Sequence, residues 1–201
     1  MRRGSSCGGR NALGVTRSAV FIDRDGTIIA EKNYLSDPDD VELVPGTVQA
    51  LHTLRTAGFA LVVVTNQGGI AWGRYATEDY HAVATRLDDQ LAAQGIVMDA
   101  TYFCPHHPAR TGPCDCRKPA LGMYRSAAVA LNLDVTTSFY VGDKLTDVQP
   151  GITLGGQGIL VRTGYGAGLE HEAPEGVWVV DDLREASRVI IDCTKGPQVG
   201  S

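Results

Sequence analysis

The sequence predicts an α/β fold in which a parallel β-sheet lies between two layers of helices. Short apolar runs rich in β-branched residues alternate along the chain with longer segments of helical periodicity. The apolar runs are continuous, as expected for strands that are buried on both faces. The chain has 201 residues, of which 43% are hydrophobic, which suits one domain with a substantial core.

Six short apolar segments are expected to form the strands of this three-layer, Rossmann-like sheet. They are Ala19 to Asp23, Phe59 to Thr65, Ala100 to Phe103, Phe139 to Val141, Gly158 to Val161 and Val177 to Val180.

Helices are expected between these strands. One segment with apolar residues at helical spacing ends at Gly58, and another begins at Thr77, a candidate capping residue, and ends at Gly95. Further helices are predicted from Gly122 to Leu131, from Thr146 to about Leu154 and from Leu183 to Ile191.

The two ends of the chain are expected to lie outside the fold. Residues 1–17 are rich in Gly, Ser and Arg and predict a disordered tail, residues 18–192 the domain, and residues 193–201 a flexible C-terminal tail. We expect a cytoplasmic protein, because no run of about 18 uncharged apolar residues occurs and the N-terminus lacks the apolar centre of a signal peptide. The formal net charge of −5 disfavours nucleic-acid binding.

Polar residues follow three of the predicted strands. The first strand runs into Asp23 and Asp25, the second into Thr65-Asn66-Gln67, and the fourth into Asp143 and Lys144. Ligands of open parallel sheets bind outside the carboxyl ends of the strands. We therefore expect these side chains to meet at one edge of the sheet.

Three carboxylates at one edge repel each other unless a cation neutralises them or one of them stays protonated. Mg²⁺ prefers oxygen ligands, so Asp23, Asp25 and Asp143 are candidate magnesium residues. One carboxylate can then attack phosphorus, while a second, two residues later, carries a proton to the leaving alcohol and takes one from water. The Thr65 hydroxyl and the Lys118 ammonium would hold the transferring group. These residues predict phosphoryl transfer through an aspartyl-phosphate.

Four motifs occur in order along the chain: FIDRDGTI, VVVTNQ, CRKP and VGDKLTD. Together they resemble the haloacid-dehalogenase superfamily of phosphohydrolases. The resemblance implies that Asp23 is the nucleophile and Asp25 the general acid and base, with the backbone carbonyl of Asp25 facing the metal. It also implies that Thr65 and Lys118 bind the phosphoryl group and that Asp143 completes the Mg²⁺ site.

Asp147 follows the last of these motifs and has two interpretations. It is either a partner of the catalytic site or a first-turn residue favoured by the helix dipole. The sequence leaves both open.

The segment CPHHPARTGPCDCRKP contains three of the five cysteines of the chain and two histidines. Cys104, His106, Cys114 and Cys116 suffice for a closed, tetrahedral structural zinc site, with His107 as an alternative to His106. The segment is rich in proline and has almost no apolar residues, so zinc would supply its order. We call this segment, residues 104–119, the zinc loop.

The zinc loop narrows the resemblance to the phosphatases of heptose bisphosphate and of histidinol phosphate, which carry such a loop instead of a large cap domain. The resemblance favours His106 as the zinc ligand and implies that Arg117 recognises the substrate. The other matching substrate positions are Arg24, Glu31, Lys32, Asn33, Tyr34, Asn66, Gln67, Gly68 and Lys144.

The segment TNQGGIAWGRY departs from the TNQSGIARGY that is usual in this branch. Gly68 replaces a serine and Trp72 an arginine, so any side-chain contact from the usual residues is lost. Arg74 either compensates for the lost arginine or is a solvated charge.

Two substrates fit this branch. The first hypothesis is removal of the 7-phosphate from D-glycero-D-manno-heptose 1,7-bisphosphate, giving heptose 1-phosphate for nucleotide-activated heptose synthesis. Its second phosphate would account for Arg117 and Lys144 beside Lys118. The alternative is histidinol phosphate, whose cationic tail would be better served by an acidic pocket.

A third hypothesis belongs to another class of protein, a non-catalytic sugar-phosphate sensor or a zinc-organised interaction domain. Such a protein would not need both Asp23 and Asp25. We expect a monomeric enzyme acting on a small sugar phosphate.

Overall fold

Six parallel strands form one sheet in the order β3-β2-β1-β4-β5-β6 in the computed structural model, which describes residues 16–194. All six predicted strands are present, and their ends differ from the prediction by at most one residue. The strands are β1 (Ala19–Ile22), β2 (Ala60–Asn66), β3 (Ala100–Cys104), β4 (Phe139–Gly142), β5 (Gln157–Val161) and β6 (Trp178–Val180).

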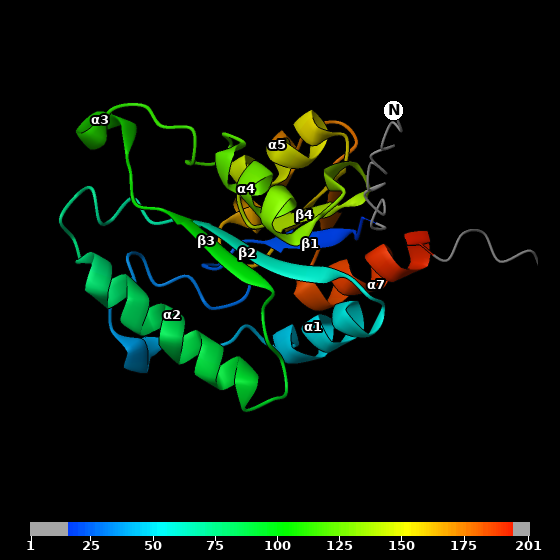
Figure 1. Ribbon diagram of the computed structural model, residues 1–201, viewed down its shortest axis with the longest axis horizontal. Helices are drawn as coiled ribbons and strands as arrows, with labels where there is room; N and C mark the ends of the chain where they lie inside the picture. Colours follow the sequence, from blue (N-terminus) through cyan, green and yellow to red (C-terminus); the bar gives the residue numbers. More distant parts are fainter. Residues whose placement is uncertain (1–15, 195–201) are drawn as a thin grey trace, which may run out of the picture.

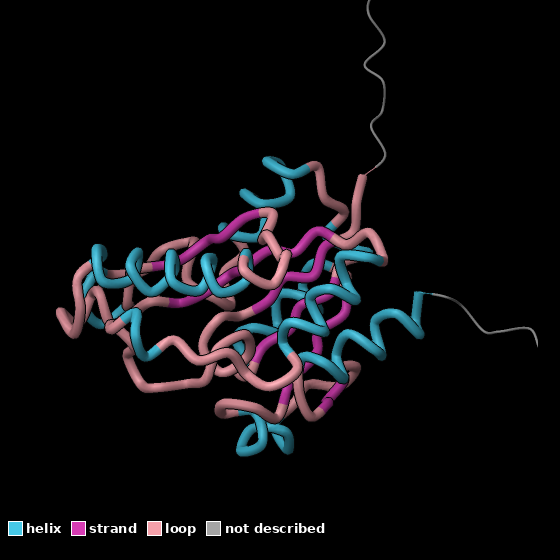
Figure 2. Tube along the Cα trace, turned by 90° about the horizontal axis from the view of Figure 1, so that it is seen from below, coloured by secondary structure: helices cyan, strands magenta, loops and turns pink. Residues whose placement is uncertain are grey.

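Helices cover both faces of the sheet (Figure 1), which confirms the predicted three-layer arrangement. One layer contains α1 (Thr47–Thr56), α2 (Thr77–Ala92) and α7 (Leu183–Thr194), and the other contains α4 (Gly122–Leu131) and α5 (Leu145–Leu154). Seen from below in Figure 2, the first layer lies in front of the strands. The short helices are α3 (Pro108–Thr111), α6 (Gly166–Leu169) and the 3-10 turns Pro38–Asp40, Val135–Thr137 and Glu170–Glu172.

The strands are apolar throughout because each of their two faces packs against a helical layer. In β1, Val20 and Ile22 join the core beneath α1, α2 and α7, whereas Ala19 and Phe21 face α4. The Phe21 ring stacks on Tyr140 of β4 with ring centroids 5.0 Å apart. Burial of both faces removes the polar alternation that a half-exposed strand would show.

The order of the strands positions the polar residues that follow them. β1 lies at the centre, paired in parallel with β2 on one side and with β4 on the other, so that Ile22 is level with Val63 and Val141. The chain proceeds outward from β1 in opposite directions in its two halves, through β2 and β3 and then through β4, β5 and β6. A reversal of this kind opens a crevice at the carboxyl ends of the strands.

The prediction that Thr77 caps α2 is wrong. Ala76 occupies the capping position, and Thr77 is the first residue of the helix. The backbone N–H of Ala76 donates to Asp79 Oδ2 at 2.7 Å, so the acidic residue of the first turn satisfies the N–H of the capping residue, although alanine has no side chain to accept an N–H of the first turn.

Most of the predicted tails, residues 1–15 and 195–201, lies outside the described residues. Arg17 is joined to the fold, since its backbone N–H donates to Asn132 O at 3.2 Å, and α7 continues to Thr194. Between residues 16 and 194, no helix combines the length and apolar character needed to cross a bilayer.

Two valine-to-alanine substitutions, one buried and one exposed, test which side chains stabilise the core. Val62 in β2 is fully buried between β1, β3 and α4, whereas Val129 on α4 is 86% exposed. We expect Val62→Ala to lower the free energy of unfolding by about 2 kcal/mol, because methyl burial is lost and a cavity forms. Val129→Ala should change it by less than about 0.5 kcal/mol. Urea denaturation of both variants measures the difference, and equal effects would contradict this packing.

Candidate active site and zinc site

Three buried carboxylates meet at the carboxyl end of the sheet. Asp23 follows β1, Asp143 follows β4, and Asp147 lies in the first turn of α5. One oxygen of each lies within 4.8 Å of the others. The two interpretations of Asp147 are therefore both realised: it faces the site, and its Oδ2 accepts the backbone N–H of Lys144 at 2.9 Å at the helix start.

The ammonium of Lys118 lies between two of these carboxylates. Its Nζ is 2.7 Å from Asp23 Oδ1 and 2.8 Å from Asp147 Oδ1, and it donates to Val64 O at 2.6 Å. Burial alone would lower the pKa of this lysine, but Asp147 and Asp23 raise it above its usual value. Lys118 is therefore a permanent positive charge in the site.

The charge of Asp143 is neutralised less by the protein than the charges of Asp23 and Asp147, because Lys118 does not pair with it. Its Oδ2 accepts the backbone N–H of Tyr165 at 2.9 Å, whereas the buried Oδ1 has no hydrogen-bond partner among the described residues. Burial, followed by the charge of Asp23, raises the pKa of Asp143 to about 7. Burial and the charge of Asp147 likewise raise the pKa of Asp23 to about 6. Both shifts indicate negative charge that the protein alone does not neutralise.

A divalent cation fits this set of oxygens. Asp143 Oδ1 and the carboxylate of Asp23 are candidate ligands, since Mg²⁺ binds carboxylates and usually keeps several waters. Both oxygens of Asp147 are already used, by Lys118 and by the helix start, which favours Asp147 as a partner of Lys118. Two glycines approach Asp143 so closely that a Cβ on Gly26 or on Gly164 would collide with its carboxylate.

The side chain of Asp25 is not part of the cluster of three carboxylates and has its own donors. Arg24, which is 2% exposed, donates from Nε to Asp25 Oδ2 at 3.1 Å and from Nη2 to Oδ1 at 3.0 Å. Gln67 Nε2 donates to the same Oδ2 at 2.8 Å, and the hydroxyl of Thr65 lies 3.5 Å from it. The carboxyl group two residues after Asp23 is thus held separately from the metal candidates.

A pocket of about 210 Å³ opens beside Asp25. Seven of the ten predicted substrate residues line it: Arg24, Glu31, Asn33, Tyr34, Gln67, Gly68 and Lys144. The ammonium of Lys144 lies 3.2 Å from Glu31 Oε2 and 4.7 Å from the centre of the Tyr165 ring. The pocket wall is therefore both charged and aromatic.

The other three predicted substrate residues do not line this pocket. Lys32 points toward Asp40 and Glu42, with its Nζ 3.8 and 3.6 Å from their carboxylates. Asn66 exchanges two hydrogen bonds with the backbone of Lys118, at 2.9 and 3.1 Å, so it fixes that residue to β2. Arg117 donates to the carbonyl of His106 at 3.0 Å.

The sequence reasoning missed Tyr75 and Tyr165, which also line the pocket. Tyr165 follows β5, whose carboxyl end reaches the same edge of the sheet as those of β1, β2 and β4. Tyr165 could therefore have been predicted from its position shortly after β5. Tyr75 is the last residue of the segment TNQGGIAWGRY, but the sequence does not show that it reaches the site, because this depends on the fold of the loop after β2.

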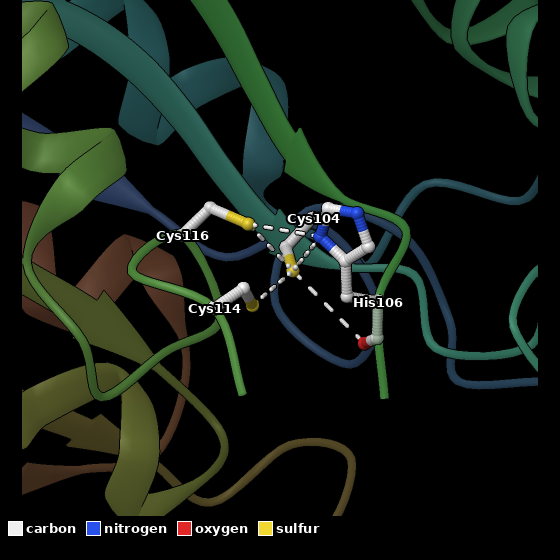
Figure 3. A group of neighbouring side chains, drawn as sticks. All are labelled: Cys104, His106, Cys114 and Cys116. Atoms are coloured by element: carbon white, nitrogen blue, oxygen red, sulfur yellow. Dashed lines mark hydrogen bonds between the residues drawn. The ribbon is translucent and has the colours of Figure 1, made fainter. Parts of the chain in front are cut away.

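Four side chains of the zinc loop point toward one another (Figure 3). Cys104 Sγ lies 3.1 Å from the sulfur of Cys116, 3.7 Å from that of Cys114 and 3.8 Å from His106 Nδ1. A tetrahedral zinc ion with Zn–S bonds of about 2.3 Å would place sulfur ligands about 3.8 Å apart. The four atoms are thus close to the geometry that zinc requires, and the donor set is one that zinc prefers.

The second histidine of the zinc loop has a different environment. His107 packs on Trp72 with ring centroids 5.1 Å apart, and the guanidinium of Arg110 lies 5.1 Å from the centre of the Trp72 ring. A Cβ on Gly68 would lie 3.0 Å from Arg117 Nη1, so the glycine at this position allows the arginine to approach. The two departures from the usual motif, Gly68 and Trp72, therefore both contact the zinc loop.

Two protein families match the chain. Residues 18–150 match the family described as polynucleotide kinase 3 phosphatase, and residues 115–186 match the family described as HAD-hydrolase-like. Together the two matches span all four motifs of the site.

Relatives of known name cover nearly the whole chain. The D-glycero-β-D-manno-heptose-1,7-bisphosphate 7-phosphatase of Yersinia pestis is 39% identical over 178 residues, which are 86% of this chain and 94% of that protein. The protein of the same name from Escherichia coli K12 is also 39% identical over 178 residues, 86% of this chain and 93% of that protein.

A solved structure is similar in both fold and sequence. The D,D-heptose 1,7-bisphosphate phosphatase of B. bronchiseptica, in complex with magnesium and phosphate, has a TM-score of 0.80 and 34% sequence identity, covering 87% of this chain and 98% of that one. The chain therefore belongs to the haloacid-dehalogenase-like hydrolases, in the family of the D-glycero-β-D-manno-heptose-1,7-bisphosphate 7-phosphatases.

Proposed function

We propose that this protein is a cytoplasmic, monomeric, Mg²⁺-dependent phosphatase that removes the 7-phosphate of D-glycero-D-manno-heptose 1,7-bisphosphate in nucleotide-activated heptose synthesis. The observation that carries the proposal is the buried Asp23–Lys118 ion pair beside Asp143 Oδ1, with Asp25 facing the adjoining pocket. Asp143 Oδ1 accepts no hydrogen bond from the described residues, and its nearest cation is Lys144 Nζ at 3.8 Å. The relatives of that name support the choice of substrate.

The first step forms a bond between Asp23 and phosphorus. Lys118 holds Asp23 Oδ1, which leaves Oδ2 to attack the 7-phosphate. As the bond between phosphorus and the sugar oxygen breaks, Asp25 donates a proton to that oxygen, and heptose 1-phosphate leaves as an alcohol. When bound, Mg²⁺ would supply the positive charge that keeps the carboxylates ionised and offsets the charge of the transferring group.

The second step restores the enzyme. A water molecule attacks phosphorus, its proton passes to Asp25, and the bond between Asp23 and phosphorus breaks to release inorganic phosphate. Thr65 and Lys118 hold the phosphoryl oxygens in both steps, since such reactions depend mainly on positioning and charge. Because these groups stay in place, the water attacks phosphorus from the side that the sugar oxygen left, and Asp23 leaves from the side that it attacked.

The charges around the pocket favour a bisphosphate over a substrate with a cationic tail. The two acidic residues that line the pocket, Asp25 and Glu31, are already paired with Arg24 and Lys144. The imidazole tail of histidinol phosphate would thus meet no free carboxylate there. A second phosphate can instead approach Lys144, and Arg117 lies close to Gly68 on the pocket wall.

The zinc loop would act on catalysis indirectly. Zinc bound by the three cysteines and His106 would fix the segment that continues into Lys118, and Asn66 holds the other side of that lysine through its backbone. The metal would thereby position the ammonium without contacting the substrate.

The nucleophile is tested by Asp23→Asn. We expect at least about a thousandfold loss of phosphate release, because the amide cannot form the aspartyl-phosphate. Zinc content and the far-ultraviolet circular dichroism spectrum should stay unchanged, which separates a chemical effect from misfolding. Turnover close to that of the unaltered enzyme would refute this assignment.

The structural role of zinc is tested by Cys116→Ser, with Cys193→Ser on the exposed face of α7 as the matched control. We expect Cys116→Ser to lose zinc and to be cleaved faster by protease within residues 104–119, since the loop has no apolar core of its own. The control should retain zinc and the original rate of cleavage. An unchanged cleavage pattern in Cys116→Ser would count against a structural metal.

The substrate is tested by comparing phosphate release from heptose 1,7-bisphosphate and from histidinol phosphate. We expect kcat/KM to favour the bisphosphate at least tenfold, which corresponds to about 1.4 kcal/mol of differential transition-state binding. A tenfold preference for histidinol phosphate would overturn the proposed substrate while leaving the phosphatase chemistry intact.

A further inference from the structure

The side chain of Gln67 is fully engaged within the protein. It is 3% exposed, and its amide nitrogen donates to Asp25 Oδ2 and to Thr65 Oγ1, at 2.8 Å in each case. Its amide oxygen accepts the hydroxyl of Tyr75 at 2.5 Å. Both amide hydrogens are thus used. Although Gln67 lines the pocket, its amide contacts the catalytic residues and leaves no hydrogen for a substrate oxygen.

Tyr75 determines which end of that amide faces Asp25. Burial raises the pKa of Tyr75 to about 12, so its hydroxyl keeps its proton and donates it to Gln67 Oε1. With the oxygen facing Tyr75, the nitrogen faces the carboxyl group. Without this donor the amide could rotate and present its oxygen to Asp25, which would replace an attraction by a repulsion.

The ring of Tyr75 is tightly packed in this position. It is 8% exposed and lies so close to Gly69 that a Cβ there would collide with it and with the ring of Tyr34. A side chain other than hydrogen at position 69 would displace the tyrosine. The second glycine of TNQGG therefore has a steric role in bringing the hydroxyl to Gln67.

We propose that Tyr75, acting through Gln67, is a positioning residue that aims the carboxyl group of Asp25 at the oxygen of the leaving sugar. The proposal rests on the role of Asp25 as proton donor in the proposed function. Arg24 donates two further hydrogen bonds to the same carboxyl group. Asp25 Oδ1 accepts one hydrogen bond from the described residues, that of Arg24, which leaves a lone pair for the transferred proton.

This role predicts a dependence on the leaving group. A sugar alkoxide is a strong base and must receive the proton of Asp25 as its bond to phosphorus breaks, whereas nitrophenolate is a weak base and leaves without one. The ratio kcat/KM reports the steps up to this departure. A misplaced Asp25 therefore lowers kcat/KM for heptose 1,7-bisphosphate and spares p-nitrophenyl phosphate.

The test compares both substrates in Tyr75→Phe, which removes one hydroxyl. We expect kcat/KM for heptose 1,7-bisphosphate to fall about tenfold and that for p-nitrophenyl phosphate by less than about twofold. Gln67→Leu should give the same pattern, and the double variant should lose little more, because both changes break one chain of contacts.

The matched control is Tyr140→Phe. Tyr140 of β4 is also buried and donates its hydroxyl to Val135 O at 2.9 Å, outside the catalytic site. Its variant should lose stability without any change in the ratio of the two kcat/KM values. Equal losses on both substrates in Tyr75→Phe, or none on either, would overturn the positioning role.

Asp25→Asn separates failure of this inference from failure of the proposed function. Equal losses on both substrates in that variant would overturn the role of Asp25, and that of Tyr75 with it. If the unaltered enzyme cleaves p-nitrophenyl phosphate but not heptose 1,7-bisphosphate, the proposed substrate is wrong. The leaving-group comparison with an alkyl phosphate that the enzyme does cleave then still decides the role of Tyr75.

Discussion

The site depends on one buried cation that is shared by two carboxylates. Lys118 Nζ lies 2.7 Å from Asp23 and 2.8 Å from Asp147, and all three side chains are at most 5% exposed. Neither the ammonium nor the carboxylates would be stable here without a partner of opposite charge, because burial of an unpaired ion costs several kcal/mol. The ammonium therefore allows β1 and α5 to bring their carboxylates together. Asp143 is not paired with this ammonium, and its Oδ1, which accepts no hydrogen bond within residues 16–194 and lies 3.8 Å from Lys144 Nζ, suits a divalent cation.

The position of that ammonium is set by contacts far from the chemistry. Lys118 lies near the end of the zinc loop, two residues after Cys116, and its backbone is fixed to β2 by the two hydrogen bonds of Asn66. The zinc loop also lies against the loop after β2 through the packing of His107 on Trp72. Order in residues 104–119 therefore bears directly on where the Lys118 ammonium lies, and this links a loop with almost no apolar residues to the buried carboxylates.

Most of the site could be predicted because its residues follow strands. Asp23, Thr65 and Asp143 each follow or end a strand of a parallel sheet, and strand order alone brings them to one edge. The roles of Gln67, Asn66 and Arg24 could not be predicted in this way. Each was predicted to contact substrate, and the structure adds that each forms hydrogen bonds with Asp25 or with the backbone of Lys118. Residue type and spacing bring a polar group near a site, but they do not specify its partner.

The sequence by itself determined the architecture, the catalytic chemistry and the four residues that could hold zinc. These features depend on local periodicity, on strand ends and on short spacings, which are properties of neighbouring residues. Only the tertiary structure decided that Asp147 shares the charge of Lys118, that Tyr75 reaches Gln67, and that Lys32 points away from the pocket. The physical reason is that a hydrogen bond or ion pair requires an approach of about 3 Å, and long-range packing determines which groups come that close.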